Sequence, residues 1–175
     1  MEQLWQGDKL VPVTLVIALP NQVGLVRSKE KDGYEAIQIA LGKQKREFKE
    51  EGGKWKVGDQ ITVNAFGEGD TVRVSGITKG RGFQGVVKRH GFHGGPKTHG
   101  QKNRHRAPGS IGSTAFQRVV PGRRMAGHMG DVRVTVKNLK VVAVDTDKNI
   151  LKIKGAVPGA RGGLLEIRKI RSTKS

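Results

Sequence analysis

Sixty consecutive residues without an acid, Thr71 to Gly130, constrain this 175-residue chain more than any other feature. The stretch holds 12 Lys or Arg residues and 13 glycines, so it supplies 12 of the formal net charges of +18. It lacks a sustained period of either a strand or a helix. Such a charge repels itself in a compact monomer, which makes a polyanion the natural partner. We therefore expect a long, irregular, functional extension that leaves the folded core near Ile77 and returns near Asp131.

The flanks of this stretch have the pattern of β-strands. They are rich in β-branched residues, several of them alternate apolar and polar positions, and turn residues separate them. Strands are expected at 11–19, 22–28, 34–41, 61–66, 71–77, 132–144, 150–155 and 164–170. The Asp and Asn residues of 145–149 predict a hairpin connection, and the only helix expected is a short one within 43–51. Eight short strands with little helix favour a small barrel or a sandwich.

Several protein classes are excluded by composition. The chain has no cysteine, which excludes disulfides, thiolate metal sites and cysteine nucleophiles. Its longest apolar run, 11–19, is too short to span a bilayer, and no basic amphipathic helix is predicted, so a membrane is not an expected partner. The N-terminus does not have the pattern of a secretory signal, and a cytoplasmic location is expected.

Three kinds of catalytic or ligand site can be weighed against the basic stretch. Gly80, Gly82 and Gly85 form a G-x-G-x-x-G, but a dinucleotide fold needs a following helix and an acid about 20 residues on, whereas the next acid is Asp131. A Ser–His–Asp arrangement also lacks a nearby acid. A zinc site would use histidines surrounded by cations, without a carboxylate to assist. The histidines concerned are His90, His93, His99, His105 and His128.

RNA binding explains the unusual features of the stretch together. Arg and Lys neutralise phosphates, and Arg can also stack on bases. Glycine allows the backbone N–H groups to approach phosphates closely. Phe83, Phe92 and Phe116 are candidates for stacking on bases, or equally for anchoring the extension to the core. A surface buried against phosphate excludes carboxylates because they would be desolvated and repelled.

A series of motifs gives the chain a specific resemblance. KGRGF, KRHGF, GGPKTHG, HRAPGSIG, MAGHMG and KGAVPG follow one another between residues 79 and 159. Together they closely resemble the bacterial type of the large-subunit ribosomal protein L three family, and the likeness covers most of the chain. The free-standing alternative is an RNA chaperone or non-specific RNA-binding protein.

The resemblance implies a mainly β fold. The expected core is a small closed β-barrel of the translation-protein type with Greek-key connections, built from residues 1–76 and 131–175. Residues 77–130 form the extension that enters rRNA. The implied function is that of a structural, non-enzymatic constituent of the large subunit that binds near the 3′ end of 23S rRNA, helps to nucleate 50S assembly and reaches toward the peptidyl-transferase centre.

The resemblance also implies partners and site residues. Neighbouring proteins would be L fourteen and L nineteen, and no cofactor, metal, membrane or small-molecule substrate is expected. The ribosome would be cytoplasmic, with an organellar one as the alternative. The tip of the extension would lie at Ser113, Thr114, Ala115, Phe116 and Gln117. The rRNA-binding residues would be Lys79, Arg81, Lys88, Arg89, His90, His93, Lys97, His99, Lys102, Arg104, His105, Arg106, Arg118, Arg123, Arg124 and His128.

Three departures from the family pattern bear on these expectations. The chain begins later than typical members, which predicts a missing first strand and affects closure of the barrel. The segment between Gly42 and Gly58 is shorter than usual, so a peripheral helix is expected to be missing. Many relatives carry a methylated glutamine after GSIG, where this chain has Ala115. That modification is therefore not expected here.

Overall fold

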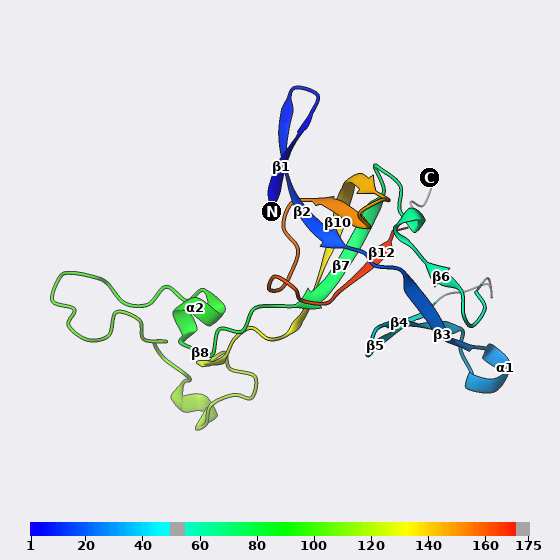
Figure 1. The fold of residues 1–175 in the computed structure, drawn as a ribbon. Helices are drawn as coiled ribbons and strands as arrows, with labels where there is room; N and C mark the ends of the chain where they lie inside the picture. Colours follow the sequence, from blue (N-terminus) through cyan, green and yellow to red (C-terminus); the bar gives the residue numbers. More distant parts are fainter. Residues whose placement is uncertain (50–54, 171–175) are drawn as a thin grey trace, which may run out of the picture. The chain divides into compact units, whose positions relative to one another are not determined.

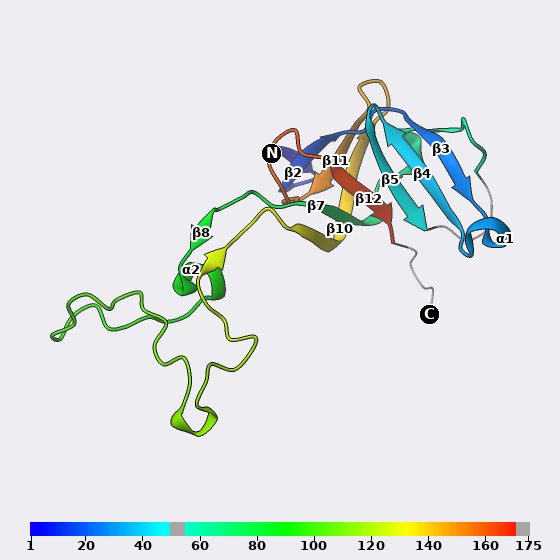
Figure 2. The ribbon, with the colours of Figure 1, turned by 90° about the horizontal axis from the view of Figure 1, so that it is seen from below.

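The computed structural model describes residues 1–49 and 55–170 and divides the chain into two compact units. The first, called the sheet unit here, comprises Met1–Val74, Thr135–Val157 and the segment from Glu166 onward. The second, called the extension, comprises Ser75–Val134 and Pro158–Leu165. The extension is chiefly irregular chain with short elements (Figure 1, Figure 2). No helix in the described part of the chain has the length and apolarity needed to cross a membrane.

The larger sheet has six strands in the order β1-β2-β11-β10-β7-β12. A tight turn at Gly7, which has a φ of +60°, joins the first two strands into a hairpin. A second hairpin joins β10 to β11 across 146–149, which confirms the predicted connection. The strands are β1 (Glu2–Gln6), β2 (Lys9–Ile17), β7 (Thr71–Ile77), β10 (Arg133–Asp145), β11 (Ile150–Lys154) and β12 (Leu165–Lys169).

The smaller sheet has four strands in the order β5-β4-β3-β6. The helix α1 (Lys29–Asp32) links β3 to β4 and ends at Gly33, whose φ of +79° suits glycine. Arg27 forms ion pairs with Asp32 at 2.6 Å and Glu47 at 3.0 Å, which ties the helix and β5 to β3. The strands are β3 (Asn21–Arg27), β4 (Ala36–Leu41), β5 (Gln44–Lys49) and β6 (Gln60–Ile61).

Alternating apolar residues of the strands form the core of the sheet unit. Val11 and Val13 of β2 are buried, and so are Leu151 and Ile153 of β11, which pairs with β2. This period of two places one face of each strand inside, and each fully buried aliphatic side chain contributes roughly 1.5–3 kcal/mol through the hydrophobic effect. Large and fully buried side chains elsewhere in the described residues include Val23, Val63, Val72, Val74 and Val141.

The strand pairing of the described residues does not by itself close the two sheets into a barrel. Within residues 1–49 and 55–170, no backbone ladder connects the edge strands β12 and β5. Side chains link these edges instead: Arg46 lies 3.3 Å from Glu166, and the Arg168 guanidinium lies 4.4 Å from the centre of the Phe48 ring. The prediction of a mainly β fold with little helix is confirmed, whereas its closure into a barrel stays a prediction.

Two predicted elements are wrong. The helix expected within 43–51 is not seen over Gln44–Lys49, which forms β5 and pairs with β4, while residues 50 and 51 lie outside the described residues. The strand expected over 61–66 is reduced to β6 and the 3₁₀ turn η1 (Val63–Ala65), in which Val63 turns into the core. Strand β1 was not predicted, although Gly7 and Asp8 between two strand-like runs are a hairpin signal.

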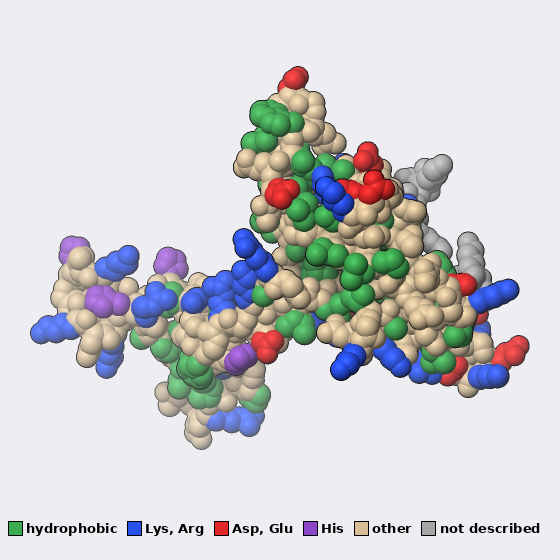
Figure 3. Space-filling model, in the orientation of Figure 1, with side chains coloured by type: hydrophobic (Ala, Val, Ile, Leu, Met, Phe, Trp, Pro, Cys, Tyr) green, Lys and Arg blue, Asp and Glu red, His purple; other side chains and the backbone are tan. Residues whose placement is uncertain are grey.

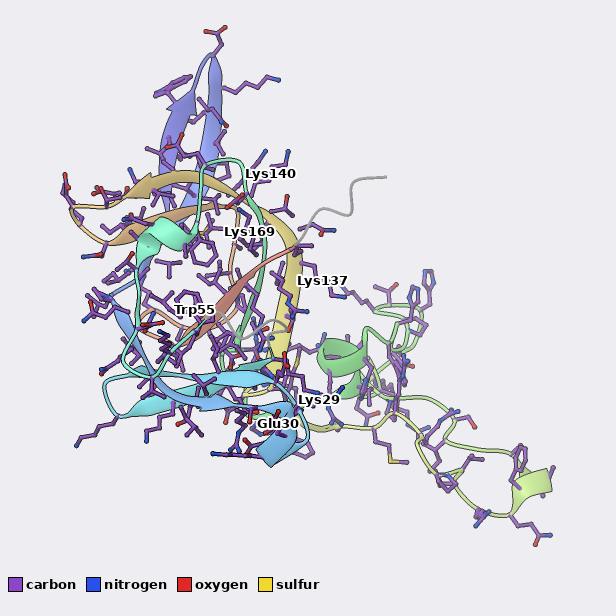
Figure 4. All side chains as sticks on the ribbon, turned by 90° about the vertical axis from the view of Figure 1, so that its right-hand side faces the viewer. Lys29, Glu30, Trp55, Lys137, Lys140 and Lys169 are labelled. Atoms are coloured by element: carbon purple, nitrogen blue, oxygen red, sulfur yellow. The ribbon has the colours of Figure 1, made fainter. Side chains whose placement is uncertain are left out.

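An ion pair at the end of β12 makes the sheet unit sensitive to acid. Lys169 (Figure 4) lies 2.7 Å from the Asp70 carboxylate, which also accepts the Gly67 N–H at 2.8 Å. The Lys169 ammonium and then the Gly67 N–H lower the pKa of Asp70 below its ordinary value. A carboxyl group with a depressed folded pKa stabilises the fold above its unfolded pKa and loses this contribution as the pH falls through the folded value.

We expect Asp70→Asn to lower the unfolding temperature at about pH 6 and to match the wild type at strong acid. The difference should shrink as the pH falls below about 4, the ordinary range of an aspartate pKa. Thermal unfolding at a series of pH values measures this difference. Asp8→Asn, at the exposed turn after β1, is the control. An Asp70→Asn difference that stays constant from neutral to strongly acidic pH contradicts the role of this pair.

Candidate nucleic-acid interface

Backbone hydrogen bonds join the two ends of the extension between 78–82 and 129–132, a region called the neck here. The Thr78 N–H donates to the Val132 carbonyl at 2.9 Å, and the Asp131 N–H donates back to Thr78 at 3.2 Å. Farther along, the Arg81 N–H donates to Met129 at 2.9 Å. Two short strands, β8 (Phe83–Gln84) and β9 (Gly127–His128), continue this pairing in antiparallel register. The outgoing and returning chains therefore hold each other in place. The paired part of the extension is called the stem here.

Gly130 is required by the close approach of the two chains in the neck. Its φ is +80°, and a Cβ at this position would lie 2.2 Å from the Lys79 carbonyl oxygen and 3.0 Å from the Arg81 nitrogen. Backbone atoms cannot move aside as a flexible side chain can. The MAGHMG motif thus contains a glycine whose role is packing within the extension.

A short helix braces the next part of the stem. Helix α2 (Val86–His90) buries Val86 and ends at Gly91, which has a φ of +72°. The Arg89 guanidinium donates to the Met125 carbonyl at 2.7 Å, and Nε2 of His90 donates to the same oxygen at 3.0 Å. Two cationic or polar side chains from the outgoing chain thereby fix the returning one.

The tip of the extension is a small closed loop. It carries the 3₁₀ turn η2 (Thr114–Phe116), and Gln117 follows in the left-handed conformation with a φ of +50°. Arg123 donates to the Ser110 carbonyl and so closes the loop at its base. Phe116 is 64% exposed, and Ile111, Val119 and Val120 are also exposed. The tip therefore exposes apolar side chains, among them an aromatic ring of the kind that can stack on a base.

The structure divides the predicted rRNA-binding residues into two groups. Four use a side chain to bind a backbone carbonyl within the extension: Arg89, His90, His105 and Arg123. The others are exposed on the extension, where Lys, Arg and His side chains gather with few acids among them (Figure 3). These are Lys79, Arg81, Lys88, His93, Lys97, His99, Lys102, Arg104, Arg106, Arg118, Arg124 and His128.

The same geometry can be compared with the dinucleotide site and the zinc site that were weighed from the sequence. The helix after Gly85 has five residues and ends at His90, and it carries no acid. Within the described residues, no three His, Asp or Glu side chains come together to hold a metal ion. The sequence did not predict the residues that hold the two chains of the stem together, such as Thr78, Met125 and Gly130. Their only sequence signal is the density of glycine on both sides of the extension.

Comparison with known proteins agrees with the motif series. Residues 10–151, most of the chain, match the family described as "Ribosomal protein L3". A relative named large ribosomal subunit protein uL3, from Dehalococcoides mccartyi, is 47% identical over 97% of this chain and 93% of its own length. Proteins of the same name from Salinispora tropica and Alcanivorax borkumensis are each 43% identical and cover 99% and 90% of this chain, with 91% and 86% of their own lengths covered. The chain belongs to the ribosomal protein L3 family.

Proposed function

We propose that this chain is built into the large ribosomal subunit by its extension, which binds rRNA along both sides of the braced stem. Membership of the family makes the chain a structural constituent of the large subunit of cytoplasmic ribosomes. The observation that carries the binding mode is the acid-free stretch 71–130, whose exposed cations lie on the extension. Phosphates are the chemical group that such a surface neutralises, and the histidines and Phe116 supply stacking and hydrogen bonding to bases.

The finer parts of this proposal extend the family resemblance to this chain. We place the binding site near the 3′ end of 23S rRNA, with a part in nucleating 50S assembly and with the tip at 113–117 directed toward the peptidyl-transferase centre. L fourteen and L nineteen are the proposed protein neighbours. The chain performs no catalysis in this proposal, because its polar groups contact RNA instead of a substrate. In the predicted division of the chain, residues 77–130 bind the rRNA. Residues 1–76 and 131–175 form a barrel-like scaffold that supports them.

The neck suggests a clean test of this division of labour. The Asp131 N–H already donates to the Thr78 carbonyl, and Asp131 has a φ of +53°, as in a hairpin whose type I turn is followed by a left-handed residue. Lys79–Gly130 can therefore be replaced with a two-residue type I turn. We expect the tagged shortened chain to unfold cooperatively, because the core valines of the sheet unit are retained. We also expect it to sediment free of large subunits in its own host, while the tagged full chain sediments with them.

The possible results distinguish the proposed function from its alternative. A shortened chain that still enters large subunits contradicts the role of the extension. A full chain that runs free of large-subunit rRNA contradicts the structural role itself. Equal binding of the full chain to unrelated RNAs, unaffected by scrambling GGPKTHG at constant charge, identifies an RNA chaperone instead.

A further inference from the structure

Two glycines and a histidine bring distant parts of the extension together beyond α2. The Gly95 N–H donates to the His105 carbonyl at 2.9 Å. A Cβ on Gly94 would lie 2.3 Å from that carbonyl oxygen, and a Cβ on Gly95 would lie 2.8 Å from the Arg104 carbonyl oxygen. The two backbone segments therefore touch, and only glycine permits this contact. They form a floor whose shape is set by backbone atoms.

A cavity of about 350 Å³ opens on this floor. Its size lies at the lower end of the roughly 300–1,000 Å³ found for small-molecule pockets. Val87 of α2 supplies an apolar wall, and the remaining lining consists of glycine backbone, two histidines and two cations, without an acid. The lining residues are Val87, His93, Gly95, Lys97, His105 and Arg106.

The hydrogen bond made by His105 fixes what its ring offers to a ligand. Nδ1 of His105 lies 2.8 Å from the Pro96 carbonyl oxygen. A carbonyl only accepts, so Nδ1 carries the proton and donates it. In the neutral ring Nε2 is then an acceptor, whose natural partners are a ribose 2′-hydroxyl or a base amino group. The ring is half-buried and held, so its orientation is set before any ligand arrives.

We propose that this pocket takes one unstacked RNA nucleotide, an inference that rests on the proposed rRNA-binding function. The base lies against Val87 and the histidine rings, the phosphate lies at Lys97 and Arg106, and Nε2 of His105 accepts a hydrogen bond from the nucleotide. Unstacked bases in single-stranded segments are what proteins recognise in RNA, by stacking and by edge contacts. The GGPKTHG and HRAPGSIG motifs thus form the two sides of one nucleotide site.

The test uses large subunits assembled with the full chain. After irradiation with short-wavelength ultraviolet light and digestion of RNA and protein, mass spectrometry identifies peptides that carry a nucleotide. We expect nucleotide adducts on the peptides that contain His93 and His105. Val87→Trp, which fills the pocket without removing a cation, should abolish them. Val57→Trp, the same change at an exposed position of the sheet unit, should leave them unchanged.

Any other result of this experiment contradicts either the nucleotide site or the proposed rRNA-binding function. Adducts that persist in Val87→Trp, or a protein segment cross-linked into the pocket, overturn the nucleotide site. Adducts elsewhere on the extension but none at this pocket overturn the site and leave the proposed function intact. An extension without any adduct overturns the proposed function. If Val87→Trp fails to assemble, Lys97→Gln with Arg106→Gln tests the same site, since it keeps the glycine floor and should lower the adduct yield.

Discussion

Replacing Lys97, Lys102, Arg104 and Arg106 together with glutamine is expected to weaken rRNA binding strongly. All four are exposed on the extension, and the structure assigns them no brace. Each phosphate contact that is lost removes about 0.7–0.9 from the slope of log K against log salt, so the slope should become less steep by about 3. Titration of a large-subunit rRNA fragment at several salt concentrations measures both affinity and slope.

The matched control removes the same charge from the sheet unit. Lys9, Lys29, Lys31 and Lys148 are exposed, and Lys29 lies on α1 (Figure 4). Their replacement with glutamine should change the slope little. The unfolding temperature of the sheet unit should be nearly unchanged in both variants, because surface substitutions rarely alter stability by more than about 0.5 kcal/mol. Equal slopes for the two variants would falsify a localised interface and indicate diffuse attraction to net charge.

Gly130→Ala is expected to open the neck of the extension and to block incorporation into large subunits. The new Cβ would lie 2.2 Å from the Lys79 carbonyl oxygen, and the φ of +80° adds backbone strain. Strain in the left-handed region and overpacking together amount to about 2–5 kcal/mol. Amide exchange at Arg81 and Met129, whose N–H groups cross the neck, should lose its protection. The sheet unit should keep its cooperative unfolding.

Gly109→Ala separates the two causes. Its φ is also +80°, but no atom lies within 4 Å of the added Cβ. This variant carries the strain without the collision, so it should retain the protection of Arg81 and Met129 and enter subunits at a level much closer to the wild type. Should Gly109→Ala and Gly130→Ala behave alike, the close approach at the neck is not what the glycine serves.

Sequence patterns predicted the strands well where burial alternates, as it does in β2 and β11. They failed where pairing decided the structure. The segment Gln44–Lys49 is rich in good helix formers, yet Phe48 pairs opposite Ile37 of β4 and the segment becomes an edge strand. Over 61–66 the β-branched residues suggested a strand, but the burial of Val63 in a 3₁₀ turn prevailed. Propensity describes a segment alone, whereas the neighbouring strand determines its final conformation.

The interface shows a similar limit. Missing acids and dense cations in the sequence indicate an RNA-binding extension, and the structure places the cations of this stretch other than Arg73 on one unit. The sequence could not separate Arg89, which donates to the Met125 carbonyl, from Lys88 beside it, which is exposed. That distinction depends on where the returning chain passes, 36 residues later. Contacts between residues so far apart in the sequence depend on the path of the backbone, so they cannot be predicted from local composition.

The hydrogen bonds between Thr78 and the pair Asp131 and Val132 have a consequence for how the chain can change its length. Pairing at this point closes a loop, and the entropy of closure grows only with the logarithm of the loop's length, at about 0.6 kcal/mol for each doubling. Residues can therefore be inserted or removed beyond the neck at little thermodynamic expense to β7 and β10. The length of the extension can therefore vary while the sheets keep their register.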